Sequence, residues 1–298
     1  MTSQSVPPAL WVIVDDGSSD ATPAILAEYA ARFPWIRTLR RADRGDRKLG
    51  GGVIDAFYAG YETIDPEAYE FVCKLDLDLV LPPRYFEILM ARMAANPRIG
   101  SCSGKAYFPA RAEAGASPTF PIDARDGYVS ERIGDDHALG MVKFYRTACF
   151  RQIGGFVREI MWDGIDSHRC RQLGWIAVSW DDPDLRFVHL RPMGTSHHDW
   201  WTGRVRHGFG QYYMGTGPAW MLASALYRMT RPPRIVGGVA MLWGYAKSML
   251  ARAPRYGGRE FRRFLRRYQR ACLWKGKARA LAELDAAQAG AWDPNGSR

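Results

Sequence analysis

Two carboxylates, Asp76 and Asp78, stand one residue apart at the end of a short apolar run, YEFVCKLDLDLVLPP, at residues 69–83. In an extended segment, side chains at positions i and i+2 point to the same side, so both acids can face one ligand. A carboxylate pair at the carboxyl edge of a buried strand suits Mg²⁺ or Mn²⁺ carrying substrate phosphates. The alternative is that both acids cap the loop before the helix expected from Pro83 onward.

A second acidic cluster, DDGSSD at residues 15–20, follows the apolar run LWVIV at residues 10–14. A helical pattern from Ala21 to Phe33 comes next, and Asp20 is placed to cap it. A carboxylate at such a turn can accept an imide N–H of a nucleobase or a ribose hydroxyl. Both clusters therefore point to a nucleotide site.

The elements that must position these acids alternate between strands and helices. Besides the run that leads into Asp76, strands are expected at 10–14, 36–40, 141–144, 176–180 and 185–190. Helices are expected at 21–33, 53–64, 83–96 and 166–173, and residues 109–137 form a loop or a sheet extension. This alternation predicts an α/β fold with a mostly parallel sheet and helices on both faces. After about residue 200 the pattern is helical, which predicts two regions, 1–200 and 201–298.

Three motifs in order resemble the inverting, metal-dependent glycosyltransferases of family 2. They are VIVDDGSSDAT at 12–22, KLDLDLVLPP at 74–83 and GGFVREIMWDGIDSHRCRQLGW at 154–175. The resemblance covers roughly residues 10–190 and implies the GT-A fold, a Rossmann-like sheet flanked by helices. It also implies a nucleotide-sugar donor and a divalent metal ion.

By this resemblance, Asp16 contacts the base or ribose of the donor, and Asp76 and Asp78 occupy the D-x-D positions that hold metal and nucleotide. A divalent ion would neutralise the charge that develops on the departing diphosphate. Arg47 and Lys48, in a Gly-rich loop, are either phosphate contacts or solvated charges.

The segment MWDGID at 161–166 falls where the family has its Glu-Asp pair. Asp163 matches the catalytic Asp, the base that takes the proton of the acceptor hydroxyl, and Trp162 replaces the Glu. The alternative is that Asp163 caps the helix expected from Asp166. His189 stands where many GT-A enzymes have a late His, as a metal ligand or a structural residue.

The acceptor contacts are expected among Trp162, Asp166, Trp200 and Trp201, with Asp166 more suited to support or capping. His197 and His198, in TSHHDWW, could serve the same acceptor site. Aromatic faces suit the C–H surfaces of sugars, although the Trp side chains could instead pack the C-terminal helices.

The N-terminal part departs from the family pattern. Members normally open with a strand, a P-x-Y-N-E-like loop and a helix before the strand that ends in DDGS, whereas here LWVIVDDGS begins at residue 10. Because the first strand would lie centrally in the sheet, we expect an incomplete chain that is poorly folded or weakly active. An upstream extension is expected to restore it.

The composition indicates a globular protein in a reducing compartment. The 47% hydrophobic and 24% charged residues are a globular balance, and the five scattered cysteines, with no C-x-x-C pair, fit a reducing cytoplasm. The start of the chain does not resemble a signal peptide. The longest apolar stretches are 212–227 and 235–246, and both are interrupted by Gly. The second is shorter than the ~20 residues that span a bilayer.

Much of the formal charge of +10 lies near the C-terminus. Eleven Lys and Arg residues between Arg252 and Arg279 stand against one acid, Glu260. Aromatic and apolar segments bounded by Arg fit an element that lies on an anionic leaflet, at the inner face of the plasma membrane. The alternative is a helical subdomain with a solvated basic face.

The sequence therefore predicts an inverting glycosyltransferase that moves a hexosyl or N-acetylhexosaminyl group, from a UDP-sugar in preference to other donors. Its acceptor is a saccharide or a lipid-linked hydroxyl, in cell-envelope or exopolysaccharide synthesis. Two alternatives stay open. A metal-dependent nucleotidyl or phosphoryl transferase would not need an acid at Asp163, and a basic module would bind nucleic acid or lipid without catalysis. Carboxylates clustered at strand ends argue against nucleic acid as a partner.

Overall fold

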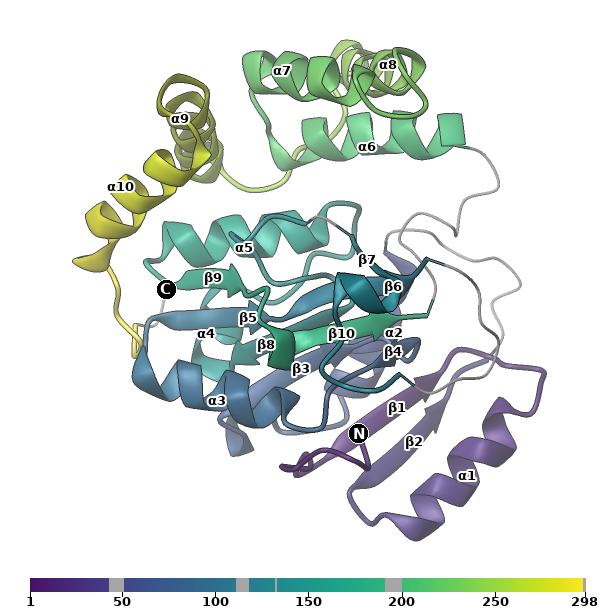
Figure 1. Ribbon diagram of the computed structural model, residues 1–298. Helices are drawn as coiled ribbons and strands as arrows, with labels where there is room; N and C mark the ends of the chain where they lie inside the picture. The colour runs from purple at the N-terminus through teal and green to yellow at the C-terminus, as the bar shows by residue number, and fades with distance from the viewer. Residues whose placement is uncertain (43–50, 111–117, 132, 191–199, 297–298) are drawn as a thin grey trace.

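The computed structural model describes residues 1–298 except for 43–50, 111–117, 132, 191–199 and 297–298. In this described part, strands are interspersed with helices as far as His189, and every regular element from Trp200 onward is a helix (Figure 1). This confirms the α/β class with a helical C-terminal region that the sequence predicts.

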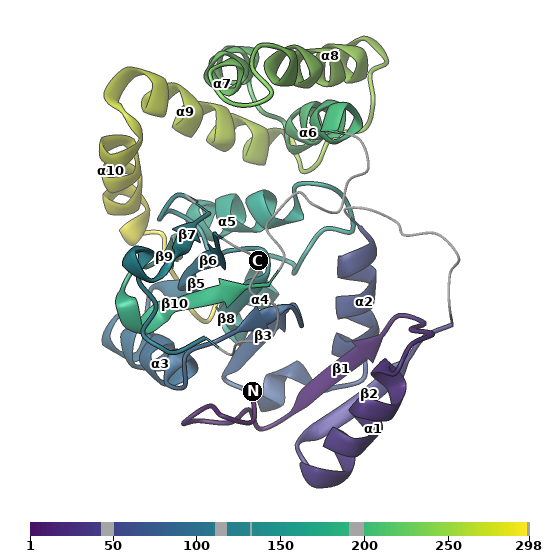
Figure 2. The same cartoon turned by 45° about the vertical axis from the view of Figure 1, so that its right-hand side comes forward.

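The first sheet has two parallel strands, β1 (Trp11–Asp15) and β2 (Ile36–Arg40), joined by α1 (Thr22–Arg32). Helix α2 (Gly52–Tyr61) packs on β1. The close approach depends on Gly60, because a Cβ there would lie 3.0 Å from Cγ2 of Val14. In Figure 2 the unit of β1, β2 and α1 stands beside the rest of the domain.

The second sheet lies at the centre and has the strand order β3-β8-β5-β9. Its strands are β3 (Phe71–Leu75), β8 (Val142–Arg146), β5 (Ile99–Ser103) and β9 (Ile176–Ser179). One face carries an apolar cluster with α3 (Tyr85–Ala95). The other face carries a cluster with α2 and α4 (Thr147–Gln152), where Trp175 is fully buried. Helix α5 (Trp162–Gln172) packs against β9 and β5. Burial on both faces explains why these strands read as apolar runs.

The third sheet has the order β4-β10-β6-β7. Its strands are β4 (Leu79–Val80), β10 (Arg186–His189), β6 (Lys105–Pro109) and β7 (Tyr128–Ser130). Single-turn helices precede three strands: η1 (Pro66–Ala68), η2 (Ala124–Asp126) and η3 (Pro183–Leu185). Of the expected loop or sheet extension at 109–137, the part that forms β7 extends a sheet.

Strand direction differs from the expected mostly parallel arrangement. Among the described strands, β1–β2, β5–β9 and β6–β10 pair in parallel, whereas β3–β8, β5–β8, β4–β10 and β6–β7 pair antiparallel. An apolar run that is buried on both faces does not indicate whether its strand runs parallel or antiparallel to its neighbours. The pattern therefore could not show that β8 lies between β3 and β5 and is antiparallel to both.

Five helices form the C-terminal region. They are α6 (Trp200–Met214), α7 (Pro218–Met229), α8 (Val236–Leu250), α9 (Arg259–Lys275) and α10 (Lys277–Ala289). Helices α6 and α8 cross at Gly208 and Gly244, where an added Cβ would lie 2.0 Å from a backbone oxygen of the other helix. The chain then returns to the α/β part, where Trp292 packs edge-on against Trp175. In the described part of the chain, no helix has the length and apolar character needed to cross a bilayer.

Candidate functional site

Asp76 and Asp78 follow the last residue of β3, as the apolar run predicts. Their side chains are 33% and 23% exposed, so both reach solvent at the carboxyl end of the strand. Oδ1 of Asp76 lies 2.5 Å from the buried ammonium of Lys74, which also donates to the backbone oxygen of Gly140 at 2.8 Å. The carboxylate pair is thus anchored to the segment that leads into β8.

His189, the last residue of β10, lies beside Asp78 and is 8% exposed in its side chain. Its Nε2 is 3.8 Å from Oδ2 of Asp78, and its Nδ1 is 2.9 Å from Oε1 of the buried Glu131. Burial opposes a positive charge on the ring, but the hydrogen bond and charge of Glu131, with the charges of Asp78 and Asp76, outweigh it and raise the pKa of His189. A carboxylate behind an imidazole fixes its orientation, which is the arrangement that metal-binding histidines usually have.

Asp163 lies in the first turn of α5 with its side chain exposed. Its Oδ2 would be 3.3 Å from a Cβ placed on Gly140, the residue whose backbone oxygen accepts from Lys74. Asp163 therefore faces the region next to Asp76, although 87 residues separate the two in sequence. It does not cap the helix: α5 begins at Trp162, earlier than the expected Asp166, and Met161 is its N-cap.

Trp162 is 8% exposed and forms part of the floor of this region. Its ring lies 5.2 Å from Nζ of Lys74 and 5.5 Å from Nζ of Lys143. Cation–π contacts of this kind fix both ammonium groups against the aromatic face. Lys143 also donates to the backbone oxygen of Asp163 at 2.9 Å, which ties the first turn of α5 to β8.

Asp166 is buried, with 1% of its side chain exposed, so a direct contact with an acceptor is not available to it. Its Oδ2 lies 2.5 Å from Nζ of Lys143 and also accepts a hydrogen bond from the hydroxyl of Tyr145. Burial raises the pKa of Asp166, while Lys143 and Tyr145 act in the opposite direction. The supporting role that the sequence favours for Asp166 fits this burial, and the acceptor role does not.

Asp15 is the last residue of β1 and Asp16 follows it, and their side chains differ in exposure. Asp15 is 3% exposed and accepts from the amide of Ser18 at 2.8 Å, which fixes the turn. Asp16 is 38% exposed and lies 3.0 Å from Nη1 of Arg41. Oδ1 of Asp20 accepts from the amide of Thr22, the first residue of α1, but the N-cap of this helix is Ala21 and not the expected Asp20.

The remaining candidate site residues lie either at the start of α6 or outside the described residues. Trp200 and Trp201 begin α6, are 49% and 37% exposed, and meet edge to face at 6.0 Å. Arg47, Lys48, His197 and His198 lie outside the described residues.

The donor groups at this site are those that Mg²⁺ or Mn²⁺ takes. Two carboxylates and an oriented imidazole come from β3 and β10, and both acids are partly exposed. Within the residues that the structure describes, no group of three His, Cys, Asp or Glu side chains is already arranged as a metal cage. Oδ1 of Asp76 contacts Lys74, and the carboxylate is partly exposed.

Three residues of the site escape sequence reasoning: Lys74, Lys143 and Glu131. Both lysines are almost fully buried in strands that otherwise read as apolar, at 4% and 0% exposure. A charge inside a buried-strand pattern is a signal, because such a charge requires a partner. Glu131 follows β7 in a segment without periodicity, and no sequence signal distinguishes it from nearby acids.

Comparison with known proteins places this site in context. The family model described as "Glycosyl transferase family 2" matches residues 7–153. Among solved structures, the mannosyltransferase PcManGT from Pyrobaculum calidifontis, in complex with GDP-Man and Mn²⁺, aligns with a TM-score of 0.45 and 18% identity over 97% of this chain and 79% of that chain. A comparison with curated protein sequences finds no match. At this identity and TM-score, the structural alignment assigns no residue or ligand to this chain.

Proposed function

The chain belongs to glycosyl transferase family 2 through residues 7–153, and from this premise we propose that it is a metal-dependent, inverting glycosyltransferase. It would move a sugar from a nucleotide-diphosphate donor to a hydroxyl acceptor. The observation that carries the proposal is that Asp76 and Asp163 are both linked to Gly140. Lys74 bonds both Asp76 and the Gly140 oxygen, and Asp163 faces the same glycine.

The donor side of the proposed site is formed by the ends of β1, β3 and β10. We assign Asp16 to the base or ribose, and Asp76, Asp78 and His189 to Mg²⁺ or Mn²⁺ bound with the diphosphate. A bound divalent ion would supply charge neutralisation at the departing diphosphate. Lys74 is a second cation next to Asp76, and its burial keeps that charge poorly screened. Arg47 and Lys48 remain proposed phosphate contacts.

On the acceptor side, we assign Asp163 as the base that takes the proton of the attacking hydroxyl. An inverting transfer needs this base on the face opposite the leaving group, and one carboxylate is sufficient. Asp163 is exposed, while Lys143 and Trp162 beneath it are buried and fix its helix turn. Trp162 forms the floor, and Trp200 and Trp201 offer exposed aromatic faces for a saccharide.

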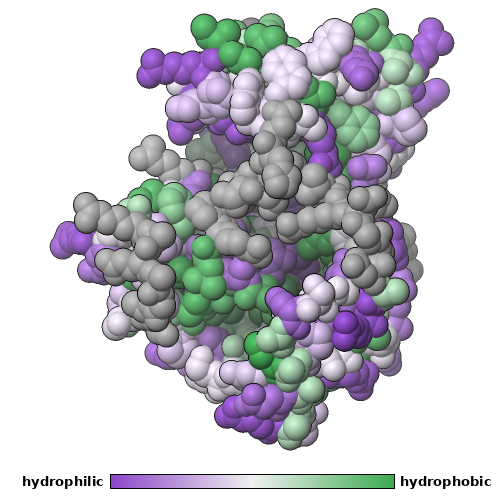
Figure 3. Space-filling view, turned by 90° about the vertical axis from the view of Figure 1, so that its right-hand side faces the viewer, coloured by the Kyte–Doolittle hydropathy of each residue, from purple (hydrophilic) through white to green (hydrophobic). Residues whose placement is uncertain are grey.

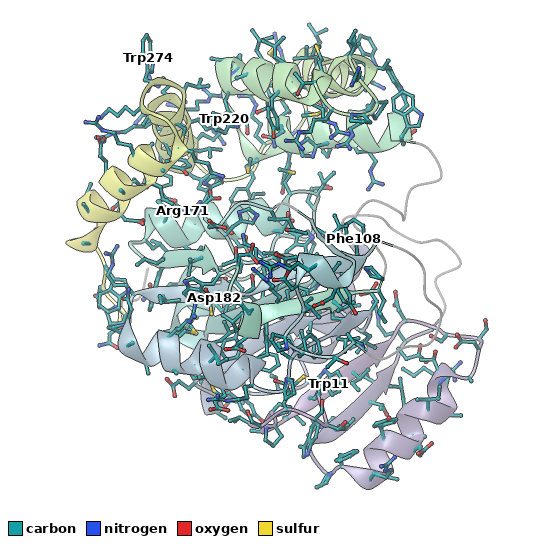
Figure 4. The ribbon with its side chains drawn as sticks, in the orientation of Figure 1. Trp11, Phe108, Arg171, Asp182, Trp220 and Trp274 are labelled. Atoms are coloured by element: carbon teal, nitrogen blue, oxygen red, sulfur yellow. The ribbon has the colours of Figure 1, made fainter. Side chains whose placement is uncertain are left out.

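The C-terminal helices, residues 201–298 in the proposed division, support a membrane-associated enzyme with a lipid-linked acceptor. Eight large apolar side chains on α7 and α8 and in the turn between them are at least 44% exposed: Leu222, Leu226, Tyr227, Ile235, Val239, Trp243, Met249 and Leu250. Figure 3 shows hydrophobic residues at the top of the molecule, interspersed with hydrophilic ones. Trp274 of α9 is 87% exposed and points outward at the same end (Figure 4).

Positive charge accompanies these apolar side chains. Arg231 and Arg234 are exposed between α7 and α8, and arginines are spread along α9. Apolar side chains together with Arg fit the headgroup region of an anionic leaflet. We therefore propose an enzyme at the inner face of the plasma membrane, in cell-envelope or exopolysaccharide synthesis. A UDP-sugar and a hexosyl or N-acetylhexosaminyl transfer are the proposed donor and reaction.

A thermal-shift panel tests the donor assignment. UDP, GDP, dTDP and CMP are each added with and without Mn²⁺, and we expect stabilisation by UDP only when Mn²⁺ is present. The Asp78→Ala variant should lose this stabilisation, whereas Asp184→Ala, at an exposed position in η3, should keep it. A ligand at 100 times its Kd stabilises by about 2.7 kcal/mol, which the shift would readily reveal. No response to any nucleotide would contradict the proposal.

A further inference from the structure

Helix α6 packs on the first turn of α5, the turn that carries Asp163. A Cβ placed on Gly210 would lie 2.5 Å from Cγ of Met161, and one placed on Gly164 would lie 3.6 Å from Sδ of Met214. In Figures 1 and 2, α6 lies between α5 on one side and α7 and α8 on the other. Side chains about one turn before Gly210 on α6 are therefore placed near the proposed base.

A chain of hydrogen bonds fixes the tautomer of His207 on α6. The amide of Gly217 donates to Oε1 of Gln269 at 3.0 Å, so Nε2 of Gln269 donates to Oγ1 of Thr216 at 3.2 Å. Thr216 in turn donates to Oε1 of Gln211 at 2.7 Å, and Nε2 of Gln211 lies 3.4 Å from Nε2 of His207. That ring nitrogen accepts, so Nδ1 carries the proton and the neutral ring keeps one N–H donor.

His207 lies near both Asp163 and a pair of arginines. Burial lowers the pKa of the His207 ring, the charge of Arg204 acts in the same direction, and the charge of Asp163 acts in the opposite one. Burial and the charge of Arg228 lower the pKa of Arg204. Because a neighbouring charge shifts a pKa over short distances, these four groups of α5, α6 and α7 are close in space.

The two half-buried arginines have no acid of their own region to pair with. Residues 200–258 contain eight Lys and Arg residues and no Asp or Glu. Among the described residues, the guanidinium of Arg204 has no ion pair or hydrogen bond, and the buried Nε of Arg228 has no acceptor. Guanidinium groups stay charged in proteins, so their mutual repulsion and desolvation persist until an anion binds between them.

Exposed apolar side chains lie next to this arginine pair on the outer side. A Cβ placed on Gly237, in the first turn of α8, would lie 3.5 Å from Nε of Arg228. Tyr227 and Ile235, which flank these two positions, are 62% and 65% exposed. From α5 outward, the order is thus a carboxylate, a neutral donor, two guanidinium groups and an apolar surface. A sugar hydroxyl, a phosphate and a lipid chain in one molecule have the same order.

We propose that Arg204 and Arg228, with His207 beside them, bind the phosphate or diphosphate that links the acceptor sugar to a lipid. The planar forks of the two arginines donate to the phosphate oxygens in pairs, and Nδ1 of His207 supplies one more donor. The sugar extends toward Asp163, and the lipid extends along the exposed apolar side chains of α7 and α8. This assignment rests on the proposed function, because it takes Asp163 as the base.

Isothermal titration of the full chain tests the site without nucleotide or metal. The probe is octyl diphosphate below its micelle concentration. Arg204→Gln and Arg228→Gln should each weaken its binding by about 10–100-fold, whereas Arg263→Gln, at an exposed position of α9, should leave the binding unchanged. Octanol and octanoate should bind at least about tenfold more weakly than the probe, because they lack the phosphate oxygens that the arginine forks fit. Unchanged melting temperatures show that the variants fold.

A membrane phospholipid also carries a phosphate, and dihexanoylphosphatidylglycerol is the comparison that separates the two sources. The proposal is overturned if this phospholipid or octanoate binds as tightly as the probe through the same two arginines. It is also overturned if both Gln variants bind the probe like the unaltered protein, even where Mn²⁺-dependent nucleotide binding is intact. Probe binding that depends on both arginines supports the site, and an absence of nucleotide binding in the same protein would then contradict the proposed function alone.

Discussion

His189 and Glu131 form a buried pair, with Nδ1 of the imidazole 2.9 Å from Oε1 of the carboxylate. The opposite nitrogen, Nε2, is thereby directed to Asp78, 3.8 Å away. Glu131 fixes both the tautomer and the direction of the ring, since Nδ1 must carry the proton that Glu131 accepts. Asp78 is thus contacted through His189 and Glu131, and Asp76 is contacted through Lys74 and Gly140. These two sets of contacts come from different strands.

Replacement of Glu131 should weaken metal binding through His189. We expect Glu131→Ala to raise the Mn²⁺ concentration for half-maximal activity by about 10–100-fold, with a smaller increase for Glu131→Gln, which keeps an acceptor but not the charge. Titration of activity and of thermal stabilisation with Mn²⁺ measures the effect. Glu28→Gln, at an exposed position of α1, is the control. A lower melting temperature without any change in the Mn²⁺ titration would leave Glu131 a structural role only.

Replacement of Asp163 should slow the catalytic step and leave donor binding unchanged. Asp163→Asn is expected to lower kcat by about 10²–10⁴-fold, because Asp163 is the carboxylate that lies against Gly140, and to leave the Kd for the donor and Mn²⁺ unchanged. Donor turnover and isothermal titration measure the two quantities. Asp184→Asn serves as the matched surface control. Normal turnover by Asp163→Asn would favour a nucleotidyl or phosphoryl transferase over a glycosyltransferase.

Asp166 should matter for stability in a way that Asp163 does not. Asp166→Ala leaves the buried ammonium of Lys143 without its carboxylate, which should cost about 3–5 kcal/mol in the free energy of unfolding. At the exposed Asp163, the change to Asn should cost less than about 0.5 kcal/mol. Urea unfolding of both variants provides the comparison. The double change Lys143→Met with Asp166→Leu should recover most of the loss, and a failure to recover would show that the ion pair is not its source.

The sequence predicts most elements of this fold and few of the contacts that join them. β2 has the expected bounds, 36–40, and the acids after β1 and β3 lie at strand ends because apolar runs followed by acids are local signals. Direction and pairing depend on residues far apart in sequence, so the antiparallel β8 was not predicted. The sequence predicts a start of α5 at Asp166 instead of Trp162, because the left-handed backbone of Met161 (φ 67°) carries no sequence signal in a non-glycine residue.

The same distinction applies to the candidate site. Asp76 and Asp78, Asp163, and His189 come from three separate segments of the chain. The sequence orders these segments without showing that Lys74 and Gly140 join Asp76 to Asp163. Their roles stay proposals, as do those of Asp16, Trp200 and Trp201.

Two histidines should make the protein less stable in mild acid. Burial lowers the pKa of His168 to about 3 and that of His207 to about 4, from an ordinary value near 6.5. Between pH 6.5 and 4 the unfolded chain binds more protons than the folded one, so stability falls as the pH falls through this window. We expect a loss of about 1–2 kcal/mol per histidine between pH 7 and pH 5.

Chemical unfolding at pH 7 and pH 5 measures this loss. The variant His168→Gln with His207→Gln is the comparison, because glutamine does not titrate. Its free energy of unfolding should change between the two pH values by about 2–4 kcal/mol less than that of the unaltered protein. Equal changes in both proteins would mean that these two rings are not the groups that bind the protons.

Binding to an anionic bilayer should depend on the exposed apolar side chains of α7 and α8. Vesicles of phosphatidylglycerol should bind the protein more strongly than vesicles of phosphatidylcholine, and salt should weaken the binding because screening acts on exposed Arg side chains. The double change Leu226→Ser with Trp243→Ser removes two side chains that are 54% exposed and should reduce co-sedimentation by about tenfold. Ile25→Ser, 51% exposed on α1, should leave it unchanged. If the double variant still sediments like the unaltered protein while added salt releases both, the attraction is electrostatic and the apolar side chains of α7 and α8 do not enter the bilayer.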